Sequence, residues 1–107
     1  MTFRTITIVQ TTVASKTQAR KLARLILQHH LGACVQTAPI GSVYRWRGKN
    51  EAGDELLVSV KTRQSAAAKL VVFIKKHHPY ELPEIIVLKV RAGREYAGWV
   101  DRETQGF

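Results

Sequence analysis

The chain has 107 residues, 45% of them hydrophobic and 23% charged, with a formal net charge of +9 and a pI of about 10.2. This composition is that of a folded globular protein and excludes a disordered chain, and no apolar run approaches the roughly 20 residues of a transmembrane helix. We therefore expect one domain over residues 1–107 and no membrane association.

The positive charge is spread along the chain rather than gathered into a nucleic-acid footprint. The 17 lysines and arginines form no run longer than Lys75-Lys76, and there is neither an aromatic RNP segment nor a Gly-X-X-Gly loop. Nucleic acid is therefore not an expected partner. A strongly basic chain favours small anions or acidic partners over the simple attraction of cations.

Cys34 is the only cysteine, so no intramolecular disulfide can form. A lone thiol fits a reducing compartment, and residues 1–5 do not resemble the start of a secretory signal. We expect a cytoplasmic protein in which Cys34 serves as a small buried apolar side chain.

The first two predicted elements are a strand and a helix. Residues 3–13 are rich in β-branched side chains, which favour a strand. Ser15 is the expected N-cap of a helix, and Gly32 is the expected left-handed C-cap. Apolar residues between them recur at helical spacing: Ala19, Leu22, Ala23, Ile26, Leu27 and, at the end, His30.

A hairpin follows. Its first strand begins near Ala33, bends around Pro39–Gly41 and continues to Trp46, with Tyr44 and Trp46 on one face. The polar stretch 48–53 supplies the turn. The second strand, 55–62, places Leu56, Val58 and Val60 on one face and Leu57, Ser59 and Lys61 on the other.

The last third of the chain predicts a helix, a strand and a short helix. Ser65 is the expected cap of a helix that ends before Pro79 and has the apolar residues Ala67, Leu70, Val71 and Ile74. The continuous apolar run 85–88 is typical of a strand buried on both faces. Residues 94–103 form a final helix with Tyr96, Trp99 and Val100 on one side.

The predicted order is β-α-β-β-α-β with an extra C-terminal helix, the ferredoxin-like α/β (α+β) arrangement, in which both main helices cover one side of one sheet. The other side carries apolar candidates such as Tyr44, Trp46 and Leu57. An open apolar sheet face suggests that copies of the chain associate through their sheets.

The stretch from His77 to Glu84 joins the second main helix to the last strand and is held by Pro79 and Pro83. Two interpretations stay open. His77 and His78 at the negative end of a helix dipole stabilise that helix without any ligand. Alternatively, the two histidines bind a metal ion, with Cys34 or Glu84 as further ligands, although no CxxC, HxxxH or HExxH spacing supports this.

Nothing in the sequence predicts catalysis. Lys61 and Glu84 are conceivable as an acid–base couple, but such a pair is more often a structural ion pair. The serines fall in strand or capping positions, and the glycines are turn residues rather than a phosphate-binding loop.

An ordered set of motifs resembles the CutA divalent-cation-tolerance family over almost the whole chain. The motifs are LGACV at 31–35, SVYRWRGK at 42–49, Glu55, Lys61-Thr62, HPYELPE at 78–84, and Tyr96 with Trp99. The resemblance implies a ferredoxin-like homotrimer with no enzymatic activity, similar in architecture to PII-type signalling trimers. It also implies a cleft between subunits, lined here by Cys34, Trp46, Lys61, His78, Tyr80, Glu84 and Trp99.

The resemblance implies a role in tolerance of copper or other divalent cations, with His77 and His78 as metal ligands. In some bacterial members a cysteine at the end of the first strand joins this histidine pair. Here the aligned residue is Thr11, whose hard hydroxyl lowers the expected affinity for Cu(I). The leading hypothesis is a trimeric, non-catalytic copper or divalent-cation binding protein. The alternative is a PII-like signalling module that binds a small anion near Lys61, and RNA binding through the sheet is the third.

Overall fold

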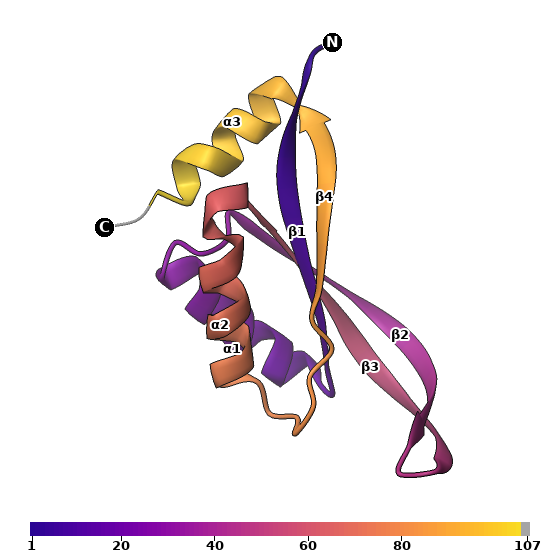
Figure 1. Cartoon of the computed structure of the whole chain (residues 1–107). Coiled ribbons are helices and arrows are strands. Elements are labelled where there is room, and N and C mark those ends of the chain that lie inside the picture. The colour runs from indigo at the N-terminus through magenta and orange to yellow at the C-terminus, as the bar shows by residue number, and fades with distance from the viewer. Residues whose placement is uncertain (106–107) are drawn as a thin grey trace.

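The computed structural model describes residues 1–105 and shows one antiparallel sheet with its helices mostly on one side (Figure 1). The elements are β1 (Phe3–Val13), α1 (Lys16–Gln28), β2 (Cys34–Trp46), β3 (Lys49–Thr62), a 3-10 turn (Gln64–Ala66), α2 (Ala67–His77), β4 (Ile86–Gly93) and α3 (Arg94–Glu103). The strand order is β2-β3-β1-β4. This is the predicted ferredoxin-like fold with an added C-terminal helix.

The core lies between the sheet and the pair α1 and α2. Alternate residues of β1 and β3 meet the buried stripe of each helix, because strand side chains alternate and helical ones recur every three or four residues. The fully buried members are Val9, Val13, Ile26, Val58, Val60, Leu70 and Ile74. A second, smaller cluster joins α3 to the sheet through Ile6, Ala97 and Val100.

Ser15 caps α1 as predicted. Its hydroxyl oxygen accepts a hydrogen bond from the Gln18 backbone N–H at 3.2 Å, and the Gln18 side chain accepts one from the Ala14 N–H at 2.9 Å. The reciprocal bonds satisfy two amide groups that a helix start leaves without partners.

The C-cap prediction is wrong. The left-handed residue after α1 is His30, with φ of 56°, and not Gly32. Position 32 requires a glycine for another reason: a Cβ there would stand 2.5 Å from Val60 Cγ1 and 2.9 Å from Ile26 Cγ2. The glycine allows the chain to pass close to the core as it enters β2.

The hairpin of β2 and β3 is longer than predicted. Its turn is only Arg47-Gly48, both with positive φ (51° and 80°), as a two-residue hairpin turn requires. The ladder then runs without a break from Trp46↔Lys49 to Cys34↔Lys61, past Pro39. Because β1 pairs with β3 only from Leu56 onward, the outer part of the hairpin projects as a two-stranded ribbon beyond the rest of the sheet (Figure 1).

Two further predictions are wrong. Ser65 does not cap α2: it lies in the 3-10 turn, and its hydroxyl accepts a hydrogen bond from Arg63 at 2.7 Å. The apolar run 85–88 is not buried on both faces: most of it lies in β4, which is an edge strand with little cover on either face of the single chain. Its side chains at Ile86, Val87 and Leu88 are 43%, 48% and 39% exposed in the single chain.

Candidate functional site

An open groove of about 920 Å³ lies between the projecting ribbon of β2 and β3 and the loop 78–85. We call it the ribbon groove. It forms because β4 begins only opposite Gln10, so the loop before it runs beside the end of β1 and the start of the ribbon. Its polar and aromatic lining includes Thr12, Tyr44, Trp46, Glu55, Tyr80 and Glu84.

Glu55 and Tyr80 form the centre of this groove. The Tyr80 hydroxyl donates to a Glu55 carboxylate oxygen at 2.8 Å, although the two residues come from the ribbon and the loop. Burial alone would raise the pKa of the Glu55 carboxyl, but hydrogen bonds from three hydroxyl groups outweigh burial and lower it; these belong to Ser42, Tyr80 and Thr12. Burial and the bond to Glu55 raise the pKa of Tyr80 far above its ordinary value. Glu55 is therefore ionised and Tyr80 is protonated at neutral pH.

His78 holds the loop against β1. Its Nδ1 accepts a hydrogen bond from the Tyr80 backbone N–H at 3.0 Å, so the proton lies on Nε2, which donates to the Thr12 carbonyl at 2.8 Å. The ring also packs edge-on against Tyr80, with 4.8 Å between centroids. Both nitrogens are thus used in positioning Tyr80 opposite Glu55.

His77 lies apart from His78. It is the last residue of α2, and its ring packs on Phe73 of the same helix at a centroid distance of 4.3 Å. The ring of His29, the C-cap of α1, also packs on Phe73, at 4.9 Å. The two histidines therefore lie in different parts of the molecule. His77 packs in the helix layer, whereas His78 positions a residue of the ribbon groove.

The residues of this chain do not fit a copper centre at His77 and His78. Binding at His78 would break one of its two hydrogen bonds, and within residues 1–105 no three His, Cys, Asp or Glu side chains gather closely enough to hold a metal ion. Thr11, the residue at the aligned cysteine position, is fully buried and faces the core. The histidine-pair site stays a hypothesis that the geometry of one chain does not favour.

The remaining predicted cleft residues lie at the inner end of the β2–β3 hairpin, away from the ribbon groove. Cys34 is opposite Lys61 in the ladder, and the Lys61 ammonium donates to the side-chain oxygen of Gln36 rather than pairing with Glu84. Cys34 is half-buried beside Tyr96, whose pKa is raised by burial and by the neighbouring thiol. Tyr96 in turn contacts Trp99, with ring centroids 5.6 Å apart.

The predicted cleft set is thus divided within one chain. Cys34, Lys61 and Trp99 lie near the inner end of the β2–β3 hairpin, whereas Trp46 is at its tip, the end of the ribbon. Twelve residues of extended strand separate Cys34 from Trp46, which corresponds to about 40 Å. A single chain therefore cannot bring both halves into one cleft.

The groove side chains that the sequence analysis did not name as site residues include Thr12, Ser42, Tyr44, Glu55 and Glu81. The signal available was that Ser42, Tyr44, Trp46 and Glu55 alternate on one face of the hairpin. Their meeting with Tyr80 depends on where the loop 78–85 lies, which no local pattern reveals.

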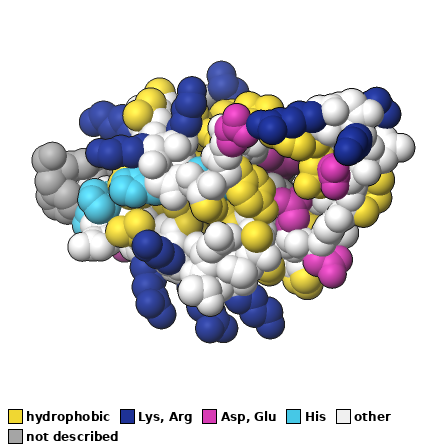
Figure 2. Space-filling model, turned by 90° about the horizontal axis from the view of Figure 1, so that it is seen from below, with side chains coloured by type: hydrophobic (Ala, Val, Ile, Leu, Met, Phe, Trp, Pro, Cys, Tyr) yellow, Lys and Arg dark blue, Asp and Glu magenta, His cyan; other side chains and the backbone are white. Residues whose placement is uncertain are grey.

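The ribbon groove is acidic in a basic protein. Three of the eight acidic residues line it, namely Glu55, Glu81 and Glu84. Arg45 is the basic residue in the lining, and its guanidinium is already bonded to Asn50 and to the Gly48 carbonyl. Beside the groove, Arg47 forms an ion pair with Glu81 at 3.1 Å. Figure 2, which views the molecule from this end, shows acidic side chains gathered over the ribbon side while lysines and arginines project around the rim.

We expect the Glu55 cluster to make stability depend on pH. Because the pKa of Glu55 is lowered from its ordinary value of 4.5, its stabilisation is complete above that value and is lost as pH falls through the folded-state pKa. Tyr80→Phe removes one hydrogen bond, so the variant should lose less stability than the native chain between about pH 6 and pH 3. Urea unfolding across this range measures the difference.

The matched control for this experiment is Tyr44→Phe, a groove tyrosine with no hydrogen bond to Glu55. It should retain the full pH dependence. Equal slopes for the native chain and Tyr80→Phe would show that the Glu55–Tyr80 bond does not lower the pKa.

Fold and groove together define the class: a ferredoxin-like α+β protein with a polar and aromatic groove on its sheet face. Among residues 1–105, no helix has the length and hydropathy that crossing a bilayer requires. A family model described as "CutA1 divalent ion tolerance protein" matches residues 7–103. The chain belongs to this family.

Relatives and solved structures agree with this assignment. The divalent-cation tolerance protein CutA of Thermus thermophilus is 40% identical over 99 residues, covering 91% of this chain and 96% of that protein. The chloroplastic protein CutA of Arabidopsis thaliana is 38% identical over 100 residues, which are 92% of this chain and 55% of that protein. The PII-like protein CutA from Nostoc superposes with a TM-score of 0.88 at 32% identity, over 94% of this chain and 99% of that one.

The chain thus spans nearly all of the Thermus protein but about half of the Arabidopsis one.

Proposed function

We propose that this chain is a single-domain, non-catalytic protein that binds divalent cations as part of cation tolerance, and that it acts as a homotrimer. The observation that carries the proposal is the acidic ribbon groove, in which an ionised Glu55 faces a cavity that Glu84 also lines; the third carboxylate there, Glu81, is already paired with Arg47. Carboxylate oxygens suit hard divalent ions, and an acidic groove concentrates cations that the basic surface would otherwise repel.

The exposed edge of β4 supports association of several copies. Ile86, Val87 and Leu88 present apolar side chains on a strand whose outer backbone groups have no neighbouring strand within residues 1–105. Such an edge is a template for pairing with another chain. A second copy would also supply the missing half of the divided cleft, because the ribbon, with Trp46 at its tip, projects well beyond the rest of its own subunit (Figure 1).

The cation proposal places the ion at Glu55 and Glu84 rather than at His77 and His78. Water or a second copy of the chain would supply the remaining ligands, because within residues 1–105 no three such side chains gather closely enough to hold a metal ion. Copper is one candidate, and manganese or zinc ions suit carboxylate ligands as well. The lone Cys34 supports a cytoplasmic location, although the Arabidopsis relative is named chloroplastic.

The test is a titration of the intact protein with CuCl2, ZnCl2 and MnCl2. In a Trp99→Phe background, Trp46 is the remaining tryptophan and reports on the ribbon groove. The double substitution Glu55→Gln with Glu84→Gln should weaken Cu(II) quenching of Trp46 at least tenfold. Light scattering of the same sample should give three times 12.1 kDa.

Asp54→Asn is the matched control, since it removes one carboxylate from the neighbouring ribbon position, which does not line the groove. Its affinity should stay within twofold of the native value. If the double variant His77→Ala with His78→Ala loses binding while the double carboxylate variant keeps it, the metal site is at the histidine pair and not in the ribbon groove. A monomeric mass would overturn the trimer and restore RNA binding through the sheet as a candidate.

A second candidate function is a PII-like signalling module that binds a small anion. It is favoured by Lys61, which lies beside Cys34 near Tyr96, and by the likeness to the PII-like Nostoc structure. Nucleotides and organic acids, screened by thermal shift alongside the metal salts, should then stabilise the protein, and Lys61→Ala should abolish that stabilisation. A stabilisation that survives Lys61→Ala would exclude this site.

A further inference from the structure

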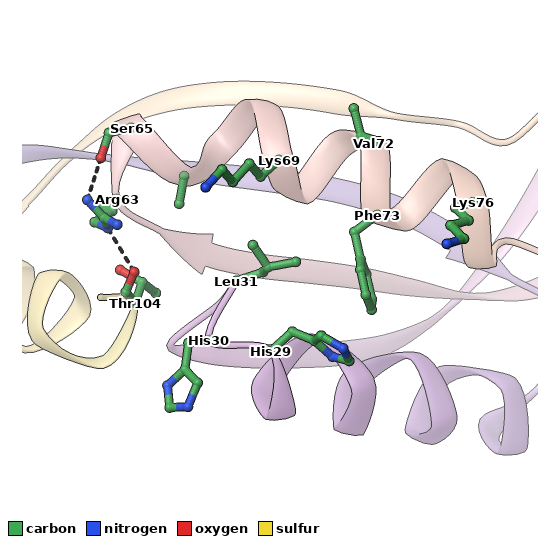
Figure 3. Close-up of a pocket in the computed structure, with 11 residues that line it drawn as sticks. His29, His30, Leu31, Arg63, Ser65, Lys69, Val72, Phe73, Lys76 and Thr104 are labelled. Atoms are coloured by element: carbon green, nitrogen blue, oxygen red, sulfur yellow. Dashed lines mark hydrogen bonds between the residues drawn. The ribbon is translucent and has the colours of Figure 1, made fainter. Parts of the chain in front are cut away.

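A second groove, of about 350 Å³, lies in the helix layer, away from the ribbon groove and from the exposed sheet edge. We call it the helix-layer groove. It is bounded by one face of α2, the segment that follows α1, and the end of α3 (Figure 3). Association through the sheet would leave it open, because its lining comes from none of the strands.

The charge of this groove is of one sign. Arg63, Lys69 and Lys76 contribute cationic groups, and His29 and His30 line the side formed by the segment that follows α1. Among the described residues that line it, there is no aspartate or glutamate. Clustered cations without acidic partners repel one another, so an anion that binds there gains from every one of them.

Arg63 is held in place before any ligand arrives. Its Nε donates to the Thr104 carbonyl at 2.8 Å, and its Nη1 donates to the Ser65 hydroxyl at 2.7 Å. Within residues 1–105 no hydrogen bond uses its Nη2, so that edge of the guanidinium remains for a ligand. A guanidinium fixed in this way loses little conformational freedom on binding a carboxylate or phosphate.

The middle of the groove is apolar. In Figure 3, Leu31 and Phe73 lie between Lys69 and Lys76. The two lysines are seven residues apart on α2, which separates their backbones by about 10 Å. Val72, 68% exposed, lies on the rim. A bare inorganic ion would leave this apolar middle in contact with water, whereas a ligand with an apolar body would cover it.

The negative end of α1 does not oppose an anion here, because its last carbonyls already have donors. The Leu25 carbonyl accepts the His29 backbone N–H at 3.1 Å and the His29 Nδ1–H at 2.9 Å, and the Ile26 carbonyl accepts the Leu31 N–H at 3.1 Å. These bonds reduce the partial negative charge that the helix end presents to the groove.

We propose that the helix-layer groove binds a small organic anion with an apolar body. The carboxylate or phosphate group lies at Arg63 and Lys69, and the body lies over Leu31 and Phe73. A volume of about 350 Å³ accommodates a one- or two-ring molecule. This site is independent of the proposed cation site and uses none of its residues.

The test uses amide NMR spectra of the full chain titrated with phenyl phosphate, benzoate, inorganic phosphate and benzyl alcohol. Phenyl phosphate or benzoate should shift the amides of residues 63–76, and the better of the two tells which acid the site prefers. Inorganic phosphate and benzyl alcohol, which each carry half of the required chemistry, should bind at least tenfold more weakly.

Lys69→Gln should weaken the binding of the better probe about tenfold. Lys75→Gln is the matched control: it removes the same charge from the same helix at an exposed position outside the groove, and its affinity should stay within twofold. Equal losses in the two variants would show diffuse surface attraction and overturn the site. So would the absence of shifts at 63–76 for both aromatic acids, or inorganic phosphate binding as tightly as phenyl phosphate.

Discussion

Gly32→Ala is expected to lower the free energy of unfolding by about 3 kcal/mol. The added Cβ would stand 2.5 Å from Val60 Cγ1 and 2.9 Å from Ile26 Cγ2, and both side chains are fully buried in the main core. Neither can move aside without displacing α1 or β3, because protein interiors are closely packed. Urea unfolding at a fixed protein concentration measures the loss.

Gly41→Ala is the matched control for this prediction. Gly41 lies in β2, and no atom lies within 4 Å of a Cβ placed there. The change should therefore leave stability within about 0.5 kcal/mol or raise it slightly, since alanine restricts the unfolded chain more than glycine does. Similar losses at positions 32 and 41 would show that backbone freedom, and not close packing, explains Gly32.

Thr11→Val is expected to raise the free energy of unfolding by about 1–2 kcal/mol. Thr11 is fully buried, and its hydroxyl has no hydrogen-bond partner among the described residues. Valine has nearly the same shape and replaces the hydroxyl by a methyl group, which removes the cost of burying an unpaired polar atom. Thermal unfolding should show a rise of several degrees.

Thr104→Val provides the contrast. Thr104 is also buried, but its hydroxyl donates to the Val100 carbonyl at 2.8 Å, so the same substitution should destabilise by about 1 kcal/mol. A loss of stability in Thr11→Val would mean that a partner, such as a water molecule, satisfies its hydroxyl. Thr62, the other buried hydroxyl without a partner among residues 1–105, should behave like Thr11.

The order of elements could be predicted from the sequence because local patterns decide it. Ser15 followed by apolar residues at helical spacing predicts α1 and its first residue, and alternation predicts that Val58 and Val60 face the core. The predicted final helix has the observed bounds, Arg94–Glu103. The motifs shared with the CutA family gave the same fold, and the match over residues 7–103 confirms the family.

Predictions from local patterns were wrong for residues whose role depends on neighbours that are distant in the sequence. An apolar run such as Ile86–Leu88 is equally compatible with a central strand and an edge strand, and only the sheet order places β4 at the edge. Gly32 resembles a helix cap in sequence, but the position of Val60, brought close by the fold, explains it.

The candidate site, too, was predicted from the sequence in part and decided by the tertiary structure in part. The sequence identified the loop from His77 to Glu84 and the tip of the hairpin as candidate site segments, because their polar and aromatic residues and the prolines that fix the loop can be recognised from the sequence alone. Tertiary structure decided what these residues do. His77 and His78 point to different parts of the molecule, and both ring nitrogens of His78 form hydrogen bonds, one with Thr12 and one with Tyr80. Tyr80 in turn is brought to Glu55, 25 residues away along the chain. Hydrogen bonds between distant segments depend on packing over the whole fold, and no local pattern encodes them.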